Sequence, residues 1–255
     1  MDVKFWKVEA AGNDFIIIDH RKPFFREKLS EIAKGLTHRR LGIGADGLIL
    51  IERSPEADFF MNFYNADGSG PVMCGNGARA ALFFVFEYGI LRNETYRFAA
   101  ADGIHRGQII NEQMSLTINQ PAEIQPIRLG SETAYLVNTG VPHLVRFSND
   151  VDALGLTTES PDLRKKYDAN INYIEKMGHG GWKIRTWERG VEGETLACGT
   201  GATASAVTIH RVCGDSFPIT MQARGGELVI DQKAGEIWLA GPVRKVFEGM
   251  FTVKE

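Results

Sequence analysis

The sequence has no segment that is typical of a membrane-bound or secreted protein. No apolar run reaches the roughly 18 residues that a transmembrane helix requires. The first residues, MDVKFWKVEAAGNDF, contain neither the charged start nor the apolar block of a signal peptide. The three cysteines are odd in number and do not suit a disulfide framework. We therefore expect a cytoplasmic protein with reduced thiols and no membrane partner.

Runs of basic residues and metal-binding motifs are absent as well. The formal net charge of the 255 residues is only −3, which argues against nucleic acid as the main partner. The six histidines show no HExxH or cysteine–histidine ligand spacing, so we expect no metal. Hydrophobic residues make up 44% of the chain and charged residues 24%, which is an ordinary globular composition with enough apolar side chains for a core.

The two halves of the chain repeat the same landmarks in the same order. Each half opens on an apolar run, a turn and a second apolar run, and later has a cysteine turn and a strand-rich tail. The corresponding positions lie about 120–130 residues apart, close to the length of one domain: Gly12 with Gly140, Cys74 with Cys198, and Gly103 with Gly225. We predict a duplication, with an N-terminal lobe at 1–118, joined by the last C-terminal residues, and a C-terminal lobe at 119–255.

Strands dominate the predicted secondary structure, because short β-branched and aromatic runs alternate with Gly, Asn and Asp turns. One apolar helix follows each cysteine turn, over residues 78–91 and 202–213. An amphipathic helix is expected near residues 26–36, and the Pro-rich segment 121–130 is typical of a linker. The predicted fold class is α/β (α+β), with two similar halves.

The cysteine turns, MCGNGARA and ACGTGATA, are the most informative repeat. A helix is expected to begin after each turn, and the unpaired amides of a helix N-terminus attract anions. Because glycines let the backbone approach a ligand, residues 75–77 and 199–201 are candidate carboxylate cradles. The same field should lower the pKa of Cys74 and Cys198 from about 8.5 toward neutrality, which suits proton exchange near pH 7.

Pairing the halves about a pseudo-two-fold axis would bring both helix N-termini and both thiols to one cleft. An amino-acid carboxylate held between the helix ends would expose its α-carbon to both sulfurs. One thiolate could then remove the α-proton while the other thiol protonates the opposite face, which inverts the stereocentre. A lone buried cysteine is usually a small hydrophobe and a lone Gly-X-Gly only a turn, but the matched pair favours the catalytic interpretation.

At these motifs the chain resembles the diaminopimelate epimerase family. The similarity runs in order along nearly the whole chain, and its most specific parts are NADGS…MCGNG and ERG…GETLACGTG. The other matching segments are AGNDF, GIGADGL, TGVPH, NINY and GPVRKVFEG. The resemblance implies two pseudo-symmetric domains, each a β-barrel-like sheet wrapped around a central helix, with the active site in the cleft between them.

The resemblance also implies an activity. Members are isomerases that convert LL-2,6-diaminopimelate to meso-diaminopimelate in lysine and peptidoglycan precursor biosynthesis, and they need no pyridoxal phosphate or other cofactor. The expected partner is thus a small amino-acid substrate, and a homodimer is left open as the assembly.

Individual residues take roles from this resemblance. Cys74 and Cys198 correspond to the catalytic acid and base, and His143 and Glu188 to polar groups that tune the cysteines. The positions that correspond to substrate-binding groups are Asn13, Asn65, Gly75, Asn76, Asn170, Glu188, Arg189, Gly199 and Thr200.

The asparagines among these residues have an alternative, structural interpretation. Asn13 and Asn65 lie beside turn sequences, where asparagine is common for conformational reasons. Asn170 precedes a short predicted strand and would serve equally well as a structural amide. The sequence alone leaves both interpretations open.

The charged candidates and the third cysteine have alternatives too. Arg189 offers a planar fork that suits a carboxylate, but an exposed arginine would look the same in the sequence. Glu188 could bind a substrate ammonium or lie at the surface, and His143 could be a packed loop histidine. Cys213 ends a predicted helix without a matching partner, so we expect it to be structural.

The chain departs from the pattern of the family at four places, among them ERGVEGET, which is one residue longer than usual, and AAGNDF in place of the commoner GLGNDF. Val141 replaces a frequent Asn in the Gly-X-Pro-His turn, and Gly47 stands where some members have Gln. The cysteine turns are unaffected, so the reaction type is expected to hold while the specificity for the distal end of the substrate stays open. The alternative functions are a racemase of another amino acid on the same fold, a thiol redox enzyme, and a non-catalytic amino-acid-binding module.

Overall fold

The computed structural model describes residues 1–25, 28–92, 95–110, 113–121 and 123–253. The chain forms two compact units. Unit 1 comprises residues 1–116 and the segment that begins at Pro242, and unit 2 comprises residues 117–241.

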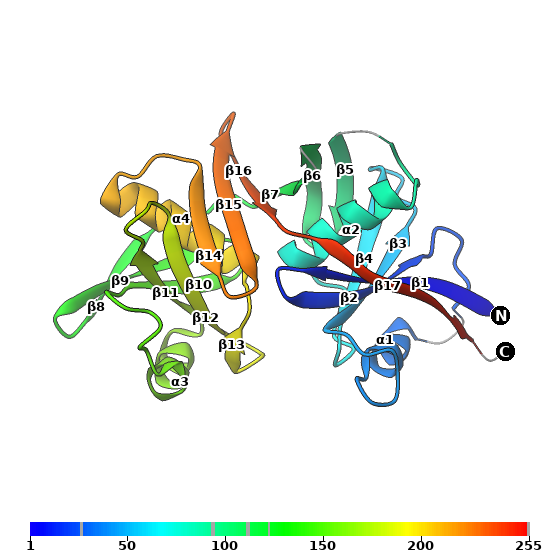
Figure 1. Ribbon diagram of the computed structural model, residues 1–255, viewed down its shortest axis with the longest axis horizontal. Coiled ribbons are helices and arrows are strands. Elements are labelled where there is room, and N and C mark those ends of the chain that lie inside the picture. The colour runs from blue at the N-terminus through cyan, green and yellow to red at the C-terminus, as the bar shows by residue number, and fades with distance from the viewer. Residues whose placement is uncertain (26–27, 93–94, 111–112, 122, 254–255) are drawn as a thin grey trace. The chain divides into compact units, whose positions relative to one another are not determined.

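The C-terminal segment belongs to unit 1 because β17 (Arg244–Thr252) pairs antiparallel with β1 (Asp2–Ala10). The first and last strands of the chain therefore lie side by side in this unit (Figure 1). The Met1 amino group donates to the Val253 carbonyl at 3.0 Å, and the Val253 amide donates back to Met1 at 2.9 Å.

Unit 1 consists of one sheet with two helices in its connections. Its other elements are β2 (Asn13–Asp19), α1 (Leu29–Thr37), β3 (Gly47–Glu52), β4 (Phe59–Asn65), α2 (Gly75–Glu87), β5 (Thr95–Ala100), β6 (Gly103–Ile110) and β7 (Gln113–Ile118). The pairs β17–β1, β1–β2, β3–β4, β5–β6 and β6–β7 are antiparallel, whereas β2–β3 and β4–β5 are parallel. The two parallel pairs are joined by α1 and α2, because a parallel connection needs a crossover.

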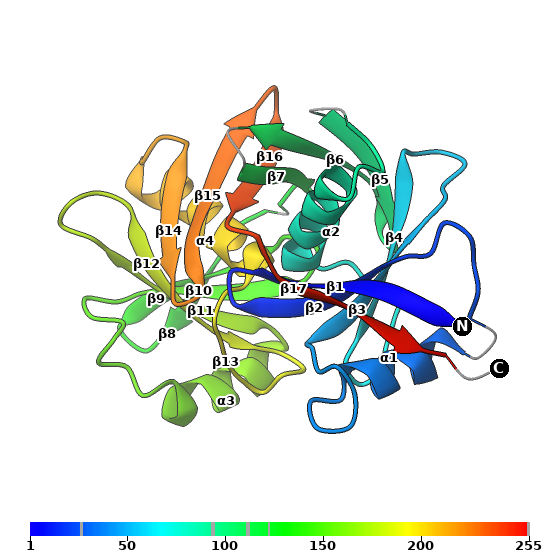
Figure 2. The same cartoon turned by 45° about the vertical axis from the view of Figure 1, so that its right-hand side comes forward.

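Unit 2 repeats this plan (Figure 2). Its elements are β8 (Gln125–Leu129), β9 (Glu132–Asn138), β10 (Pro142–Phe147), α3 (Leu156–Tyr167), β11 (Asn170–Lys176), β12 (Trp182–Glu188), β13 (Gly193–Thr195), α4 (Gly199–Cys213), β14 (Ile219–Ala223), β15 (Gly226–Lys233) and β16 (Glu236–Gly241). The pairs β10–β11 and β12–β14 are parallel and their crossovers contain α3 and α4, while the other pairs are antiparallel.

The order of parallel and antiparallel pairs is thus the same in both units, with β17–β1–β2 corresponding to β8–β9–β10. The cysteine turn occupies the same connection in each unit, directly before α2 and directly before α4. The predicted α/β fold class, with two pseudo-symmetric halves that each build a sheet around a central helix, is confirmed.

The central helices are buried on nearly all sides by their own sheets. Helix α2 packs against β1, β2, β3 and β4, and α4 packs against strands from β9 to β16. Gly107 on β6 shows how closely the sheet approaches, since a Cβ there would lie 2.5 Å from the side chain of Leu82 on α2. Small residues inside α2 and α4 allow this close packing.

Both central helices begin earlier than the sequence predicted. They start at Gly75 and Gly199, immediately after the cysteines, because the Gly-X-Gly residues already adopt helical conformations. Helix α2 also ends before the predicted residue 91, since Gly89 has a φ of +72° and interrupts the helix. The helix expected near 26–36 is α1, at Leu29–Thr37.

Two elements were not foreseen. Helix α3 is polar and contains Pro161, features that are typical of loops, yet Leu156 and Leu163 anchor it to the core of unit 2. The predicted linker at 121–130 is wrong for residues 125–129, which form strand β8. Because β9 is the one strand of the described chain that pairs with β8, β8 is an edge strand, where Pro126 is tolerated.

Candidate active site

Cys74 is the N-cap residue of α2. Its backbone is extended, with φ −138° and ψ 118°, and the Gly77 amide donates to its Sγ at 3.4 Å. The thiol is therefore held over the amides of the first helical turn, half-buried and without a disulfide. This position is suited to stabilise negative charge on the sulfur or on a bound carboxylate.

Asn13 and Asn76 are brought together beside Cys74. The Asn76 side-chain amide donates to Oδ1 of Asn13, and Asn13 in turn donates to Oδ2 of Asp46 at 3.0 Å. The Oδ1 atom of Asn76 accepts a hydrogen bond of 2.6 Å from Arg79, which lies one turn further along α2. Both amides are thus fixed in orientation, because the series begins at a guanidinium, which only donates, and ends at a carboxylate, which accepts.

Asn65 lies at the end of β4 and takes part in the following turn. Its side-chain amide donates to the Ser69 hydroxyl at 2.9 Å, and the Ser69 amide donates to Asp67 at 2.8 Å. These bonds support the turn interpretation of Asn65, while its contact with substrate stays a prediction. Gly47, opposite Asn65 in the β3–β4 register, has no room for a side chain, because a Cβ would lie 2.2 Å from the ring of Phe63.

Cys198 is the N-cap residue of α4. The pKa of its thiol is shifted in the direction opposite to the one that the sequence predicts. Its Sγ lies 3.5 Å from the Thr200 hydroxyl. Desolvation and the nearby Glu188 carboxylate raise the pKa of the Cys198 thiol well above its ordinary value, although the Thr200 hydrogen bond acts in the opposite direction. The predicted fall of this pKa toward neutrality is therefore wrong for Cys198, since burial and a like charge outweigh the helix N-terminus.

Glu188 and Thr200 are themselves positioned by neighbours. The carboxylate of Glu188 accepts a hydrogen bond of 2.8 Å from Thr195, which β13 presents opposite the end of β12. The carbonyl oxygen of Thr200 accepts a bond of 3.0 Å from the hydroxyl of the buried Thr139, in the β9–β10 turn. The first turn of α4 is thus held by a contact from the β9–β10 turn.

His143 is fully buried and held in its neutral form. Its Nδ1 lies 3.0 Å from the side-chain amide of Asn172, whose Oδ1 accepts the Thr186 hydroxyl at 3.0 Å. Burial lowers the pKa of His143 to about 3, and the positive charge of Arg189 contributes to the same shift. The Nε2 atom of the ring is buried and has no hydrogen-bond partner among the described residues.

Asn170 connects His143 to Arg189. It lies opposite His143 in the parallel β10–β11 register, and its amide donates to the Pro142 carbonyl at 3.1 Å. Its Oδ1 accepts the backbone amide of Arg189 at 2.9 Å. The Arg189 side chain is half-buried and pairs with Asp168 at 2.9 Å, so a carboxylate ligand would have to displace or share this ion pair.

The sequence-predicted residues therefore form one cluster in unit 1 and two in unit 2. Unit 1 brings together Cys74, Gly75, Asn13 and Asn76, while Asn65 bonds within its own turn. Unit 2 brings together Cys198, Thr200 and Glu188 on one side, and His143, Asn170 and Arg189 on the other. The roles of all these residues stay predictions.

The structure adds two side chains that the sequence analysis did not single out. Arg79 could have been noticed as the one charge in the otherwise uncharged stretch GNGARAALFFVF. Asn172 lies two residues from Asn170 and so on the same face of β11, which is a signal that alternation along a strand supplies. Both contact candidate residues directly.

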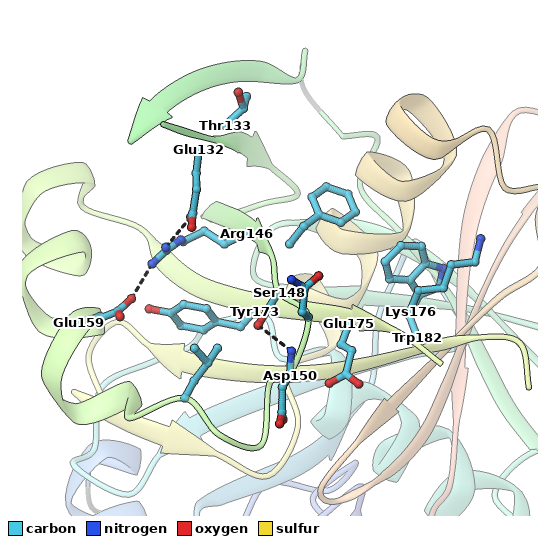
Figure 3. A pocket seen from close by; sticks show the side chains of 13 residues that line it. Glu132, Thr133, Arg146, Ser148, Asp150, Glu159, Tyr173, Glu175, Lys176 and Trp182 are labelled. Atoms are coloured by element: carbon cyan, nitrogen blue, oxygen red, sulfur yellow. Dashed lines mark hydrogen bonds and ion pairs between the residues drawn. The ribbon is translucent and has the colours of Figure 1, made fainter. Parts of the chain in front are cut away.

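A pocket of about 740 Å³ in unit 2 contains none of the predicted site residues (Figure 3). Its polar side chains largely satisfy one another, as where Arg146 pairs with Glu132 and Glu159 at 2.8 Å each and covers the Tyr173 ring. It therefore offers no convergent set of unsatisfied groups for catalysis.

The described residues contain neither a metal-binding cluster nor a membrane-spanning helix. Within the described parts of the chain, no group of three or more His, Cys, Asp or Glu residues is arranged to hold a metal ion. No helix in those parts has both the length and the apolar character to span a membrane.

Known sequences show where the chain belongs. The sequence model of the family named diaminopimelate epimerase matches residues 5–120 and 135–246. The diaminopimelate epimerase of Chlorobaculum tepidum is 37% identical, over 96% of this chain and 100% of its own. That of Nitratiruptor is 39% identical, over 95% of this chain and 96% of its own.

Solved structures show the same fold at low sequence identity. A PhzF-family phenazine biosynthesis protein of Bacillus anthracis has a TM-score of 0.80 at 15% identity, over 99% of this chain and 100% of its own. A hydroxyproline epimerase of Agrobacterium vitis has a TM-score of 0.68 at 13% identity, over 98% and 92%. With the fold and the sequence relatives in agreement, the chain belongs to the diaminopimelate epimerase family and is an enzyme of the isomerase class.

Proposed function

We propose that this enzyme interconverts LL- and meso-2,6-diaminopimelate, with Cys74 and Cys198 as the acid and base. Support comes from family membership and from relatives of that name that match nearly their whole length. The observation that carries the proposal is that each unit holds a half-buried cysteine as the N-cap of its central helix. The proposed role is a step of lysine and peptidoglycan precursor biosynthesis.

The proposed reaction is a proton transfer at one carbon. A thiolate at one cysteine removes the α-proton and becomes a thiol, and the thiol of the other cysteine protonates the carbanionic carbon on its opposite face and becomes a thiolate. Atoms and charge balance, and the configuration at the α-carbon is inverted. The reverse reaction uses the two sulfurs in exchanged roles, so the proposal requires that both reach the same carbon.

The charge that develops on the substrate has to be stabilised by the protein. Lowering the barrier by on the order of 10 kcal/mol or more is the usual demand on an enzyme. In the proposal, the amides of the first turns of α2 and α4, at Gly75–Asn76 and Gly199–Thr200, bind the α-carboxylate and stabilise the carbanionic form. The same turns carry further contacts, because the Asn76 side chain bonds with Asn13 and Arg79 and the Thr200 carbonyl accepts from Thr139.

The protonation state of Cys198 supports a division of roles. Because the Glu188 carboxylate and desolvation raise the pKa of Cys198, its sulfur holds a proton at neutral pH. In the proposal, Cys198 is therefore the proton donor in the resting enzyme. The Glu188 carboxylate accepts a hydrogen bond from Thr195. Its negative charge favours the protonated form of the Cys198 thiol.

The experiment that tests the proposed function follows α-deuterium uptake from heavy water across a panel of amino acids. We expect deuterium to enter LL-diaminopimelate and its meso product, and lysine, glutamate and proline to remain unlabelled. Labelling of another amino acid in place of diaminopimelate would identify a different racemase and contradict the proposal. Labelling of none of them would contradict the epimerase activity itself.

A further inference from the structure

Arg79 is placed where folding energetics give no reason for a charge. Its side chain is completely buried in unit 1, on the central helix α2. No carboxylate among the described residues forms an ion pair with it, and its Nε and Nη1 atoms are buried without hydrogen-bond partners there. Burying an unpaired charge is unfavourable, so a guanidinium at this position destabilises the fold by itself.

The helix makes the position of the charge less favourable still. Arg79 is the fifth residue of α2, and helical side chains point back toward the N-terminus, where the helix dipole is already positive. Its one hydrogen bond, from Nη2 to Oδ1 of Asn76 at 2.6 Å, shows that the guanidinium reaches the first turn. The positive end of the helix dipole and the positive charge of the guanidinium thus lie together at the first turn of α2.

Among the described residues, the two acidic groups that act electrostatically on Arg79 are the Glu9 carboxyl and the Cys74 thiol. The Glu9 carboxylate is already engaged, because it accepts 2.7 Å and 2.9 Å bonds from Arg244 and from the Gly12 amide. Cys74 is the N-cap of the same helix, with its sulfur over the first turn. Desolvation lowers the pKa of Arg79 only to about 10, so the side chain stays charged at neutral pH.

We propose that Arg79 is a positioning residue that keeps a desolvated positive charge behind the first turn of α2, fixing the Asn76 side chain and stabilising negative charge at the Cys74 sulfur. The inference rests on the proposed function only in taking Cys74 as a reacting thiol. The stability lost by burying the guanidinium is offset in the catalytic cycle, when the thiolate forms or a carboxylate binds at the first turn.

The test is the reaction of Cys74 with iodoacetamide as a function of pH, followed by peptide-resolved mass spectrometry on the full chain. A neutral reagent is chosen so that its own charge does not respond to the substitution. We expect Arg79→Met to slow the reaction of Cys74 at pH 7 by about tenfold or more and to move its pH profile upward, because thiolate is lost. Arg79→Lys keeps a charge, so its alkylation rate at Cys74 should stay within about threefold of that of the unsubstituted protein. The control Arg40→Met removes an exposed charge of unit 1 and should change this rate by no more than about twofold.

Thermal melting separates this role from a structural one. Since Met replaces a buried, unpaired charge by an apolar chain of similar length, Arg79→Met should melt at or above the temperature of the unsubstituted protein. A lower melting temperature together with an unchanged rate at Cys74 would make Arg79 structural and overturn the proposal. If the Met variant does not fold, the rate of alkylation at Cys74 is compared between Arg79→Gln and Arg79→Lys. Equal rates in these two variants would overturn the proposal. Because alkylation needs no turnover, the result is independent of whether the chain epimerises diaminopimelate.

Discussion

The side-chain amide of Asn172 lies 3.0 Å from Nδ1 of His143, and its oxygen accepts the Thr186 hydroxyl at 3.0 Å. With its oxygen engaged by a donor, Asn172 presents its N–H to the ring, so Nδ1 is an acceptor and the ring proton lies on Nε2. Asn172 therefore sets the tautomer of a fully buried histidine.

The first prediction concerns this contact. Asn172→Leu leaves Nδ1 of His143 and the Thr186 hydroxyl buried without partners, so the free energy of unfolding should fall by about 2 kcal/mol or more. Thr186→Val, which removes one hydroxyl and leaves His143 bonded, should lose only about 1 kcal/mol. Urea unfolding of the two variants measures the difference, and equal stability of Asn172→Leu and the unsubstituted protein would refute the role given to Asn172.

The second prediction is a dependence of stability on pH. Burial lowers the pKa of His143 from 6.5 to about 3, so between these values the unfolded chain binds a proton that the folded chain does not. The free energy of unfolding should thus decrease as the pH falls below 6.5, by up to about 1.4 kcal/mol per pH unit from this group.

Urea unfolding between pH 6.5 and 4.5 isolates this contribution from that of Asp14, whose pKa is lowered from 3.8 to about 2 and whose effect begins only in stronger acid. His143→Gln should show a flatter dependence on pH than the unsubstituted protein. The exposed His179 provides the matched control, because His179→Gln should keep the original slope. Identical slopes in all three proteins would show that His143 titrates normally.

The third prediction tests the electrostatics of Cys198. Because the Glu188 carboxylate raises the pKa of this thiol, Glu188→Gln should lower that pKa and speed the alkylation of Cys198 by iodoacetamide at pH 7, by about threefold or more. Glu227→Gln removes an exposed carboxylate from the same unit and should have no effect. A slower reaction of Cys198 in Glu188→Gln would contradict the prediction, because it would mean that the Glu188 carboxylate lowers the pKa of this thiol.

The fourth prediction compares equivalent glycines in the two helices. A Cβ at Gly201 would lie 2.5 Å from Oδ1 of Asn172, whereas one at Gly77 would lie 3.4 Å from its nearest neighbours. Gly201→Ala should therefore destabilise the protein by about 2 kcal/mol through overpacking, and Gly77→Ala should be neutral or stabilise it by about 0.5–1 kcal/mol. The two values come from denaturant titrations, and the opposite ranking would contradict the packing described here.

The parts of the fold that the sequence predicts well are those with local causes. The cysteine turns before α2 and α4 are visible because glycines and small residues mark a helix start wherever they occur, and the repeat reveals the duplication. Helix α3 and strand β8 are not predicted from local sequence, because Pro161 and Pro126 are typical of loops. Packing against the core makes the first proline acceptable, and the edge position of the strand makes the second acceptable.

The electrostatics of the candidate site depend on neighbours that are distant in sequence. A helix N-terminus alone predicts a lowered pKa at Cys198, but Glu188 comes close only because β12 ends beside the turn before α4. Arg79 is similarly invisible to periodicity, because no pattern of apolar residues predicts that a guanidinium will be wholly buried. Such effects follow from tertiary contacts and need coordinates.

Conversion of LL-diaminopimelate in heavy water by Cys74→Ser and Cys198→Ser, beside the unsubstituted enzyme, tests the central claim most directly. We expect the unsubstituted enzyme to form meso product with one solvent deuterium at the inverted α-carbon. Each serine variant should lose epimerisation by about a thousandfold or more, since a hydroxyl cannot replace a thiol as acid or base near neutral pH. Epimerisation at close to the original rate by either variant would contradict the two-cysteine mechanism.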